Sequence, residues 1–268
     1  MTRFLIVPQW QGSPSARGML LVDGANAIAG DLPRRDTTIL DVPLEAGESL
    51  DTGVRRLSSL LRVRELMRDS ITATDGHLVL VGGDCSVSVF ALSALDTSDV
   101  AVLWCDAHPD LHTPQSSPSG AFSGMALRAV LGEGEAQLAL SPAIAPERVV
   151  LLGARSIDEE ELDALSGLTA LSPHDAQDPA AVAAAVRATG ATKVWVHIDV
   201  DVIDPGDFEG VSDAAPFGIG TSALVAAIKS VRETMPLAGA TIAGFAPRTP
   251  ADAVQDMGAV LRLIGAVA

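Results

Sequence analysis

The sequence predicts an α/β protein built on a mostly parallel sheet that helices cover on both faces. Short apolar runs rich in valine, leucine and isoleucine recur along the chain, and segments with helical spacing lie between them. A strand that is apolar throughout is typical of a parallel sheet, because such a sheet is buried on both faces. No low-complexity linker or internal repeat interrupts this alternation. We therefore expect one domain over residues 1–268, an ordinary size for a single α/β core.

The strands and helices follow from these two patterns. Functional residues of a parallel sheet gather outside the carboxyl ends of its strands, so the chemistry is sought there. The apolar runs that predict strands are Phe4–Val7, Thr38–Val42, Leu78–Val81, Val100–Trp104, Val149–Leu152, Val194–Ile198 and Thr241–Phe245. The segments that predict helices are Val54–Ser70, Ser86–Leu95, Pro179–Thr189, Thr221–Met235 and Ala251–Ile264.

Composition narrows the class of partner. The formal net charge is −16, which makes nucleic acid and anionic membrane surfaces poor partners. Plain solubility explains most of this charge, and acidic clusters can also hold metal cations or a cationic substrate. The apolar run before Pro8 is too short for a signal peptide, and no later run approaches membrane-spanning length. The two cysteines, Cys85 and Cys105, are expected to be reduced thiols, so we expect a cytoplasmic protein.

Polar side chains cluster after three of the predicted strands. Gly82–Ser86 reads GGDCS, "VLWCDAHPDLH" places Asp106, His108 and Asp110 at alternate positions, and "VWVHIDVDVIDP" does the same for Asp199 and Asp201. Alternate residues of an extended chain share one face, so each group can point into one pocket. Lone aspartates after strands are commonly turn formers or helix caps, and we assign that role to Asp204 before Pro205.

Converging carboxylates need a counter-charge. Such groups at the ends of buried strands would repel one another and raise one another's pKa. A divalent cation removes the difficulty, and two cations that share bridging carboxylates remove it better. The combined D-x-H-x-D and D-x-D patterns therefore predict a metal site.

These motifs resemble those of the ureohydrolases, the family of arginase, agmatinase and formimidoylglutamase. The similar region runs from about Leu78 to Pro247 and contains "WCDAHPD" and "HIDVDVIDP" in the family's order. The resemblance implies a three-layer α/β/α fold with about eight strands, the arginase/deacetylase fold. It also implies a homo-oligomer, a trimer or hexamer, and two manganese-type ions that activate a bridging water. Carried over by position, the implied metal ligands are Cys85, Asp106, His108, Asp110, Asp199 and Asp201.

Several positions depart from the family pattern. Cys85 replaces a histidine ligand and suits zinc or iron better than manganese. Ser123 stands where the family has its proton-shuttle histidine, and Gly244 stands where a glutamate holds the guanidinium. Arginine and agmatine thus become poor substrate guesses. His112 replaces a substrate-side asparagine; it could act as the general acid, or it could be an ordinary loop histidine.

The remaining candidates are weaker. We place His112, Ser123 and Asp110 in catalysis, and His112, Ser119, Asp158 and Gly244 on the substrate side. Asp158 lies where the family often places a carboxylate for a substrate amine. His197 precedes Asp199 by two residues and either orients a ligand carboxylate or is a core histidine.

Three functional readings compete. The first is a ureohydrolase-like metalloenzyme that hydrolyses the C–N bond of an amidine- or amide-type small molecule and is not a standard arginase. The second is a catalytically impaired or metal-free relative that acts in binding or assembly, which the loss of the shuttle histidine and the glutamate favours. The third is hydrolysis of an acyl amide, as in the deacetylases that share this fold.

Overall fold

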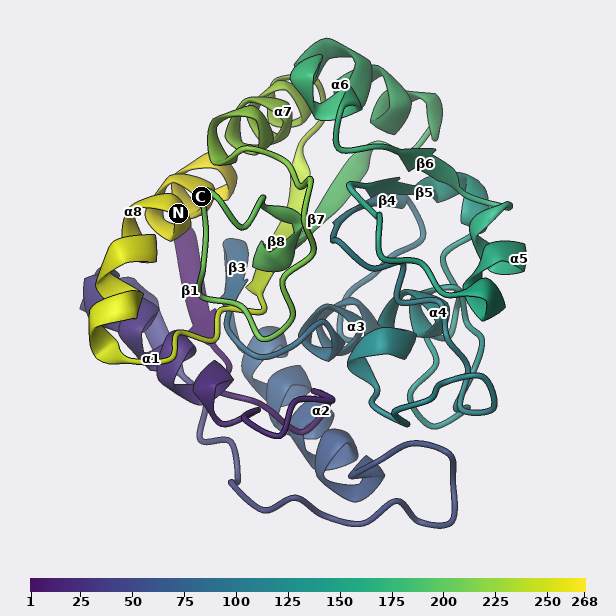
Figure 1. The fold of residues 1–268 in the computed structure, drawn as a ribbon, viewed down its shortest axis with the longest axis vertical. Helices are drawn as coiled ribbons and strands as arrows, with labels where there is room; N and C mark the ends of the chain where they lie inside the picture. Colours follow the sequence, from purple (N-terminus) through teal and green to yellow (C-terminus); the bar gives the residue numbers. More distant parts are fainter.

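The computed structural model describes all 268 residues, which form a sheet of eight parallel strands between two layers of helices (Figure 1). This confirms the predicted fold class, including the mostly parallel sheet. The strand order across the sheet is β2-β1-β3-β8-β7-β4-β5-β6. The strands are β1 (Thr2–Ile6), β2 (Thr37–Ile39), β3 (His77–Val81), β4 (Val100–Cys105), β5 (Val149–Leu152), β6 (Thr169–Leu171), β7 (Lys193–Asp199) and β8 (Leu237–Ala243).

The helices lie in the segments that connect these strands. All five predicted helices are present, with ends that shift by at most three residues. The sequence reading missed the first helix, whose segment contains two glycines, and two short helices of four and five residues. The helices are α1 (Leu20–Asp31), α2 (Leu57–Thr72), α3 (Ser86–Ser93), α4 (Ala126–Val130), α5 (Leu162–Leu165), α6 (Pro179–Ala188), α7 (Thr221–Thr234) and α8 (Pro250–Val267).

Strand β6 is the one strand that the apolar pattern does not reveal. It has three residues, it pairs only with β5 at the sheet edge, and it is mostly exposed. An edge strand of this kind needs no continuous apolar run, because one of its edges has no partner strand and much of its surface faces water. The hydrophobic pattern therefore identifies the buried strands and overlooks this one.

Two hydrophobic clusters form the core, one on each face of the sheet. Helices α1, α6, α7 and α8 contribute to one cluster, and α2, α3 and α4 contribute to the other (Figure 1). Side chains of β7 alternate between them: Val196 and Ile198 pack in the first cluster, whereas Trp195 packs in the second. Cys105, at the end of β4, is fully buried in the first cluster, on the side away from Trp104.

The strand order brings the chemical motifs together. Strands β3, β8, β7 and β4 are consecutive neighbours in the centre of the sheet, so the loops that follow them meet at one edge. The turn after β3 needs glycine, because Gly82 and Gly83 have φ values of +95° and +75°. A Cβ on Gly82 would also overlap the side chain of Ala25 in α1. This turn directs Asp84 and Cys85 towards the loops after β4 and β7.

A membrane-spanning role finds no support among the helices. No helix, including α8, the longest of them, is both long and apolar enough to cross a bilayer.

Candidate functional site

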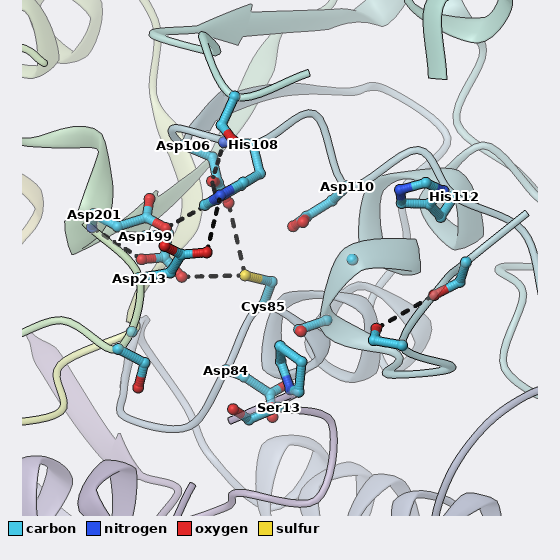
Figure 2. A pocket seen from close by; sticks show the side chains of 18 of the residues that line it. Ser13, Asp84, Cys85, Asp106, His108, Asp110, His112, Asp199, Asp201 and Asp213 are labelled. Atoms are coloured by element: carbon cyan, nitrogen blue, oxygen red, sulfur yellow. Dashed lines mark hydrogen bonds and ion pairs between the residues drawn. The ribbon is translucent and has the colours of Figure 1, made fainter. Parts of the chain in front are cut away.

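A cavity of about 340 Å³ opens at the carboxyl ends of the central strands (Figure 2). Loops after β3, β4, β7 and β8 supply its floor, and the segments around residues 112–124 and 156–161 supply one wall. All the site residues that the sequence predicts line this cavity: Cys85, Asp106, His108, Asp110, His112, Ser119, Ser123, Asp158, Asp199, Asp201 and Gly244.

The deepest donor group surrounds Cys85, which immediately precedes α3. Its thiol lies 3.2 Å from Asp199 Oδ2 and 3.6 Å from Asp106 Oδ2, and it can donate its single hydrogen to either oxygen. All three side chains are buried. A thiol that faces two carboxylates is unusual in a core, and it is a donor set suited to a borderline-soft cation.

A second donor group surrounds His108 and is nearer the opening. The imidazole Nδ1 lies 3.0 Å from Asp201 Oδ2 and 3.5 Å from Asp106 Oδ1. Asp106, His108 and Asp201 have ligand atoms within 4.8 Å of one another, and so have Cys85, Asp106 and His197. Asp106 belongs to both groups, so the arrangement could hold two cations that share one carboxylate.

Asp110 carries an unpaired oxygen beside these groups. Its Oδ2 atom is buried and has no hydrogen-bond partner, and its backbone adopts a positive φ of 55°. Both features are uncommon for aspartate, since buried carboxylate oxygens are normally hydrogen-bonded and positive φ values cost energy. A cation bound here would satisfy the free oxygen, so the orphaned atom fits the metal hypothesis.

Burial and mutual repulsion disfavour the ionised forms of the acidic groups in this site. Burial, followed by repulsion from neighbouring carboxylates, raises the pKa of the Cys85 thiol and the pKa values of Asp110 and Asp199 well above their ordinary values. The same two causes raise the pKa of Asp201 to about 6.

The pKa values of His108 and Asp106 shift in opposite directions, although burial opposes both shifts. The nearby imidazoles of His108 and His197 hold the pKa of Asp106 below its ordinary value, and the carboxylates of Asp106 and Asp201 raise the pKa of His108 to about 12. Without a metal ion, bound protons therefore reduce the negative charge of the site.

Metal binding should release these protons. Because the pKa values of Cys85, Asp110 and Asp199 are raised, the metal-free site holds protons near neutral pH, and a cation displaces them. Ionisation of these groups also destabilises the metal-free fold as pH rises, so the gain in Tm on adding metal should be larger at pH 8 than at pH 6. Calorimetric titration in buffers of different ionisation enthalpy would count the protons, and the absence of proton release would contradict this description.

The wall formed by the segments around residues 112–124 and 156–161 holds a second acidic cluster. His112 Nε2 lies 3.1 Å from Asp158 Oδ2 and 3.9 Å from Glu161 Oε2, and its Nδ1 lies 3.1 Å from Ser116 Oγ. In Figure 2, His112 lies apart from the Asp199 and Asp201 side chains, with Asp110 between them. This end of the cavity could bind a positively charged part of a substrate.

Glu161 is the residue of this wall that the sequence reading missed. It is almost fully buried, and its carboxylate accepts hydrogen bonds from the backbone N–H groups of Leu111 and Asp158. It therefore ties the loop that carries Asp110 to the loop that carries Asp158. The available signal was the D-x-x-E spacing from Asp158 to Glu161, which is a capping box in the structure.

Two further charged residues position loops and were not predicted. Asp84 is buried and accepts hydrogen bonds from Gln9 Nε2 at 2.9 Å and from the backbone of Ser86 at 3.1 Å, which fixes the turn that carries Cys85. The guanidinium of Arg155 donates to backbone carbonyls behind Asp201, and burial lowers its pKa. Its acceptors are the carbonyls of Gly153, Asp201, Val202, Ala215 and Pro216.

Asp204 and Asp213 lie close to the site but differ in role. Asp204 accepts hydrogen bonds from the backbone N–H groups of Gly206 and Gly218, so the structure places it as a turn former. Asp213 is exposed at the mouth of the cavity, where its Oδ2 lies 3.9 Å from His108 Nε2. It therefore adds negative charge to the entrance.

Comparisons with known proteins place this geometry in context. A family profile described as the Arginase family matches residues 26–264. N(omega)-hydroxy-L-arginine amidinohydrolase of Streptomyces lavendulae is 33% identical over 217 residues, covering 78% of this chain and 74% of the relative. The arginase of Bacillus caldovelox has a solved structure with a TM-score of 0.82, 26% identity and 98% coverage of both chains. The structure of Entamoeba histolytica arginase in complex with L-ornithine gives a TM-score of 0.83 at 23% identity, with 98% coverage of both chains.

Proposed function

The chain belongs to the Arginase family of metal-dependent hydrolases that act on C–N bonds, and from this premise we propose that it hydrolyses the amidino C–N bond of a weakly basic, substituted guanidine. The observation that carries the proposal is the pair of donor groups that share Asp106 at the floor of the cavity. Hydrolysis of such a bond needs a strong nucleophile at neutral pH, and Cys85, the one thiol that lines this cavity, is buried and has a raised pKa.

The floor residues fit divalent cations. Cys85, Asp106, Asp110 and Asp199 would hold one ion, and Asp106, His108, Asp199 and Asp201 would hold the other. Bound metal ions supply a water whose pKa is lowered towards neutrality and polarise the carbon that water attacks. Manganese is the metal that the family resemblance implies, whereas the thiol of Cys85 favours zinc or iron at its own ion.

The residues of the chain have the remaining work of binding the substrate and moving its proton. Departure of an amine from the tetrahedral centre requires a proton on the leaving nitrogen. His112 is the one histidine that lines the cavity outside the donor groups, so we assign it this transfer. Asp158 and Ser116 hold its two ring nitrogens at 3.1 Å each, which fixes the orientation of the imidazole. Ser123 and Ser119 line the same part of the cavity and would donate hydrogen bonds to the substrate.

Gly244 sets the substrate class. Its φ is +83°, and a Cβ at this position would overlap the carboxylate of Asp199, so no acidic side chain can pair with a guanidinium here. An N-hydroxy substituent withdraws electrons and makes a guanidine less basic, so an N-hydroxyguanidine depends less on such a partner. The name of the Streptomyces relative agrees with this class. We infer that the carboxylates of Asp158 and Glu161 bind the amino group of the substrate.

A substrate panel tests the proposal. The metal-loaded protein should convert Nω-hydroxy-L-arginine and water to L-ornithine and hydroxyurea. Its kcat/KM should exceed that for L-arginine by about tenfold or more, which corresponds to about 1.4 kcal/mol of transition-state binding. Agmatine and an N-acetylated amine complete the panel. Preference for arginine would contradict the substrate class, preference for the acetylated amine would favour amide hydrolysis, and no turnover with metal bound would favour a binding protein.

Substitutions at Cys85 test the ligand assignment. Cys85→Ser should lower the metal content, because a neutral hydroxyl is a poor ligand in place of a thiolate. Cys85→His should keep the metal and shift the preference towards manganese. Metal content is measured by elemental analysis after dialysis, with Cys105→Ser as the matched control, because Cys105 is buried on the far face of β4. Full metal occupancy in Cys85→Ser would show that Cys85 only packs.

A further inference from the structure

His197 on β7 is a buried histidine that the proposed function leaves unexplained. It is fully inaccessible to solvent, and its Nε2 atom has no hydrogen-bond partner. Its ring stacks on Trp104 with 3.7 Å between ring centroids, and its Nδ1 lies 2.8 Å from Ser88 Oγ on α3. Because an unpaired polar atom in a core costs free energy, the unpartnered Nε2 calls for a cause.

The Cys85 donor group lies beside Nε2. Nε2 lies 3.7 Å from Asp106 Oδ2, and Cys85 Sγ lies 3.6 Å from the same oxygen. The ligand atoms of all three residues fall within 4.8 Å of one another. A separation of 3.7 Å is too long for a hydrogen bond between Nε2 and the carboxylate. The imidazole nitrogen thus faces a thiol and a carboxylate without bonding to either.

These separations suit a cation between the three atoms. Zinc binds sulfur at about 2.3 Å, imidazole nitrogen at about 2.0 Å and carboxylate oxygen at about 2.1 Å, in a tetrahedron. The edges of such a tetrahedron are about 3.6 Å from sulfur to oxygen and about 3.4 Å from nitrogen to oxygen. The observed 3.6 Å and 3.7 Å approach these lengths. Asp199 Oδ2 lies 3.2 Å from Cys85 Sγ and is a further carboxylate donor on the sulfur side of this group.

We propose that His197 is a metal ligand, and that it joins Cys85, Asp106 and Asp199 in a thiolate and imidazole site that selects zinc over manganese. The inference rests on the proposed metal-dependent function and names the metal of one of its two positions. Sulfur and nitrogen donors favour zinc, whereas manganese prefers carboxylate and water oxygens. The histidine that the family resemblance places at residue 85, after β3, is thereby replaced by one on β7, which β8 separates from β3 in the sheet.

Ser88 holds His197 in the form that ligation needs. A metal-binding imidazole carries its hydrogen on the other ring nitrogen and donates it to an oxygen nearby. Ser88 Oγ lies at that position next to Nδ1 and can accept the hydrogen, which leaves the Nε2 lone pair directed at the donor group. The indole Nε1 of Trp195, 3.5 Å from Ser88 Oγ, is a further donor towards this oxygen. Ser88 is therefore a positioning residue for His197.

Nitrogen NMR of the zinc-loaded wild-type protein tests the proposal without any substitution. The chain has only five histidines, so the ring nitrogens can be assigned individually. We expect His197 to carry its hydrogen on Nδ1, with Nε2 at the chemical shift of a zinc-bound nitrogen. A hydrogen on Nε2 in the zinc-loaded protein would overturn the proposal. If the wild-type protein binds no metal, then the proposed function itself fails.

Variants measure the contribution of the ligand. His197→Phe keeps the ring that stacks on Trp104 and should weaken zinc binding about 100-fold or more, with smaller effect on manganese. Ser88→Ala should weaken zinc binding about tenfold. The exposed His174 supplies the control His174→Phe, which should bind zinc like the wild type. Zinc affinity is read by competition with a chelator, and thermal unfolding verifies the fold. A folded His197→Phe variant that binds zinc as tightly as the wild type, and whose zinc X-ray absorption spectrum still shows a sulfur ligand, would contradict ligation by His197. The proposed function would then still stand.

Discussion

The Asp199→Asn variant is expected to lose its metal and about 10³-fold or more in kcat/KM on the preferred substrate. Asp199 lies in both proposed donor sets, with Oδ2 at 3.2 Å from Cys85 Sγ and Oδ1 accepting from the backbone N–H of Asp201 at 3.0 Å. Asparagine keeps the size and one oxygen but removes the negative charge. A loss of 10³-fold corresponds to about 4 kcal/mol, which is the scale of stabilisation that a bound metal supplies.

The measurement for Asp199→Asn is metal content together with steady-state kinetics, and the matched control is Asp204→Asn. Asp204 lies in the same loop, but its oxygens accept from the backbone of Gly206 and Gly218, and it does not line the cavity. The control should retain metal and turnover. An Asp199→Asn protein that holds metal and works like the wild type would exclude Asp199 as a ligand.

The Gly244→Glu variant should fail to become an arginase. By family resemblance this substitution restores the residue that holds a guanidinium, so a sequence comparison alone predicts a gain of arginine hydrolysis. The structure predicts the reverse, because Gly244 has a φ of +83° and a Cβ there would overlap the carboxylate of Asp199. Positive φ costs about 1–2 kcal/mol for a residue with a side chain, and the overlap displaces a proposed ligand.

Thermal unfolding and metal content of Gly244→Glu separate these outcomes. We expect a lower Tm, reduced metal content and no new activity on arginine, and Gly244→Ala should show the same direction with a smaller effect. Gly258 in α8 is exposed, and a methyl group added there would have no neighbour within 4 Å, so Gly258→Ala should leave Tm unchanged or raised. Arginine turnover in a stable, metal-bound Gly244→Glu protein would refute this account of the substrate class.

The sequence predicted the parts of the fold that follow from local patterns. Buried strands such as β4 and β7 are continuous apolar runs, and the aspartates at their ends are close because parallel strands end at one edge. The ureohydrolase resemblance is confirmed by the family match. The site residues that it implied line a single cavity, and their roles remain predictions.

The features that sequence reasoning missed depend on contacts between distant segments. Glu161 acts through the backbone of Leu111, which lies 50 residues earlier in the chain. Arg155 holds carbonyls up to 61 residues away, and no local pattern marks it. His197 looked like a core histidine or a support for a carboxylate, because the sequence cannot show that Nε2 lacks a partner. Such long-range relations appear only in three dimensions.

Anomalous diffraction from crystals of the protein grown with both zinc and manganese tests the central claim most directly. Data at each metal's absorption edge report the identity and the position of every bound ion together. We predict an ion beside Cys85 and Asp199 that scatters as zinc, and a second ion beside His108 and Asp201, with Asp106 between them. The absence of any anomalous peak at the carboxyl ends of β3, β4 and β7 would contradict the account of this protein as a metal-dependent hydrolase.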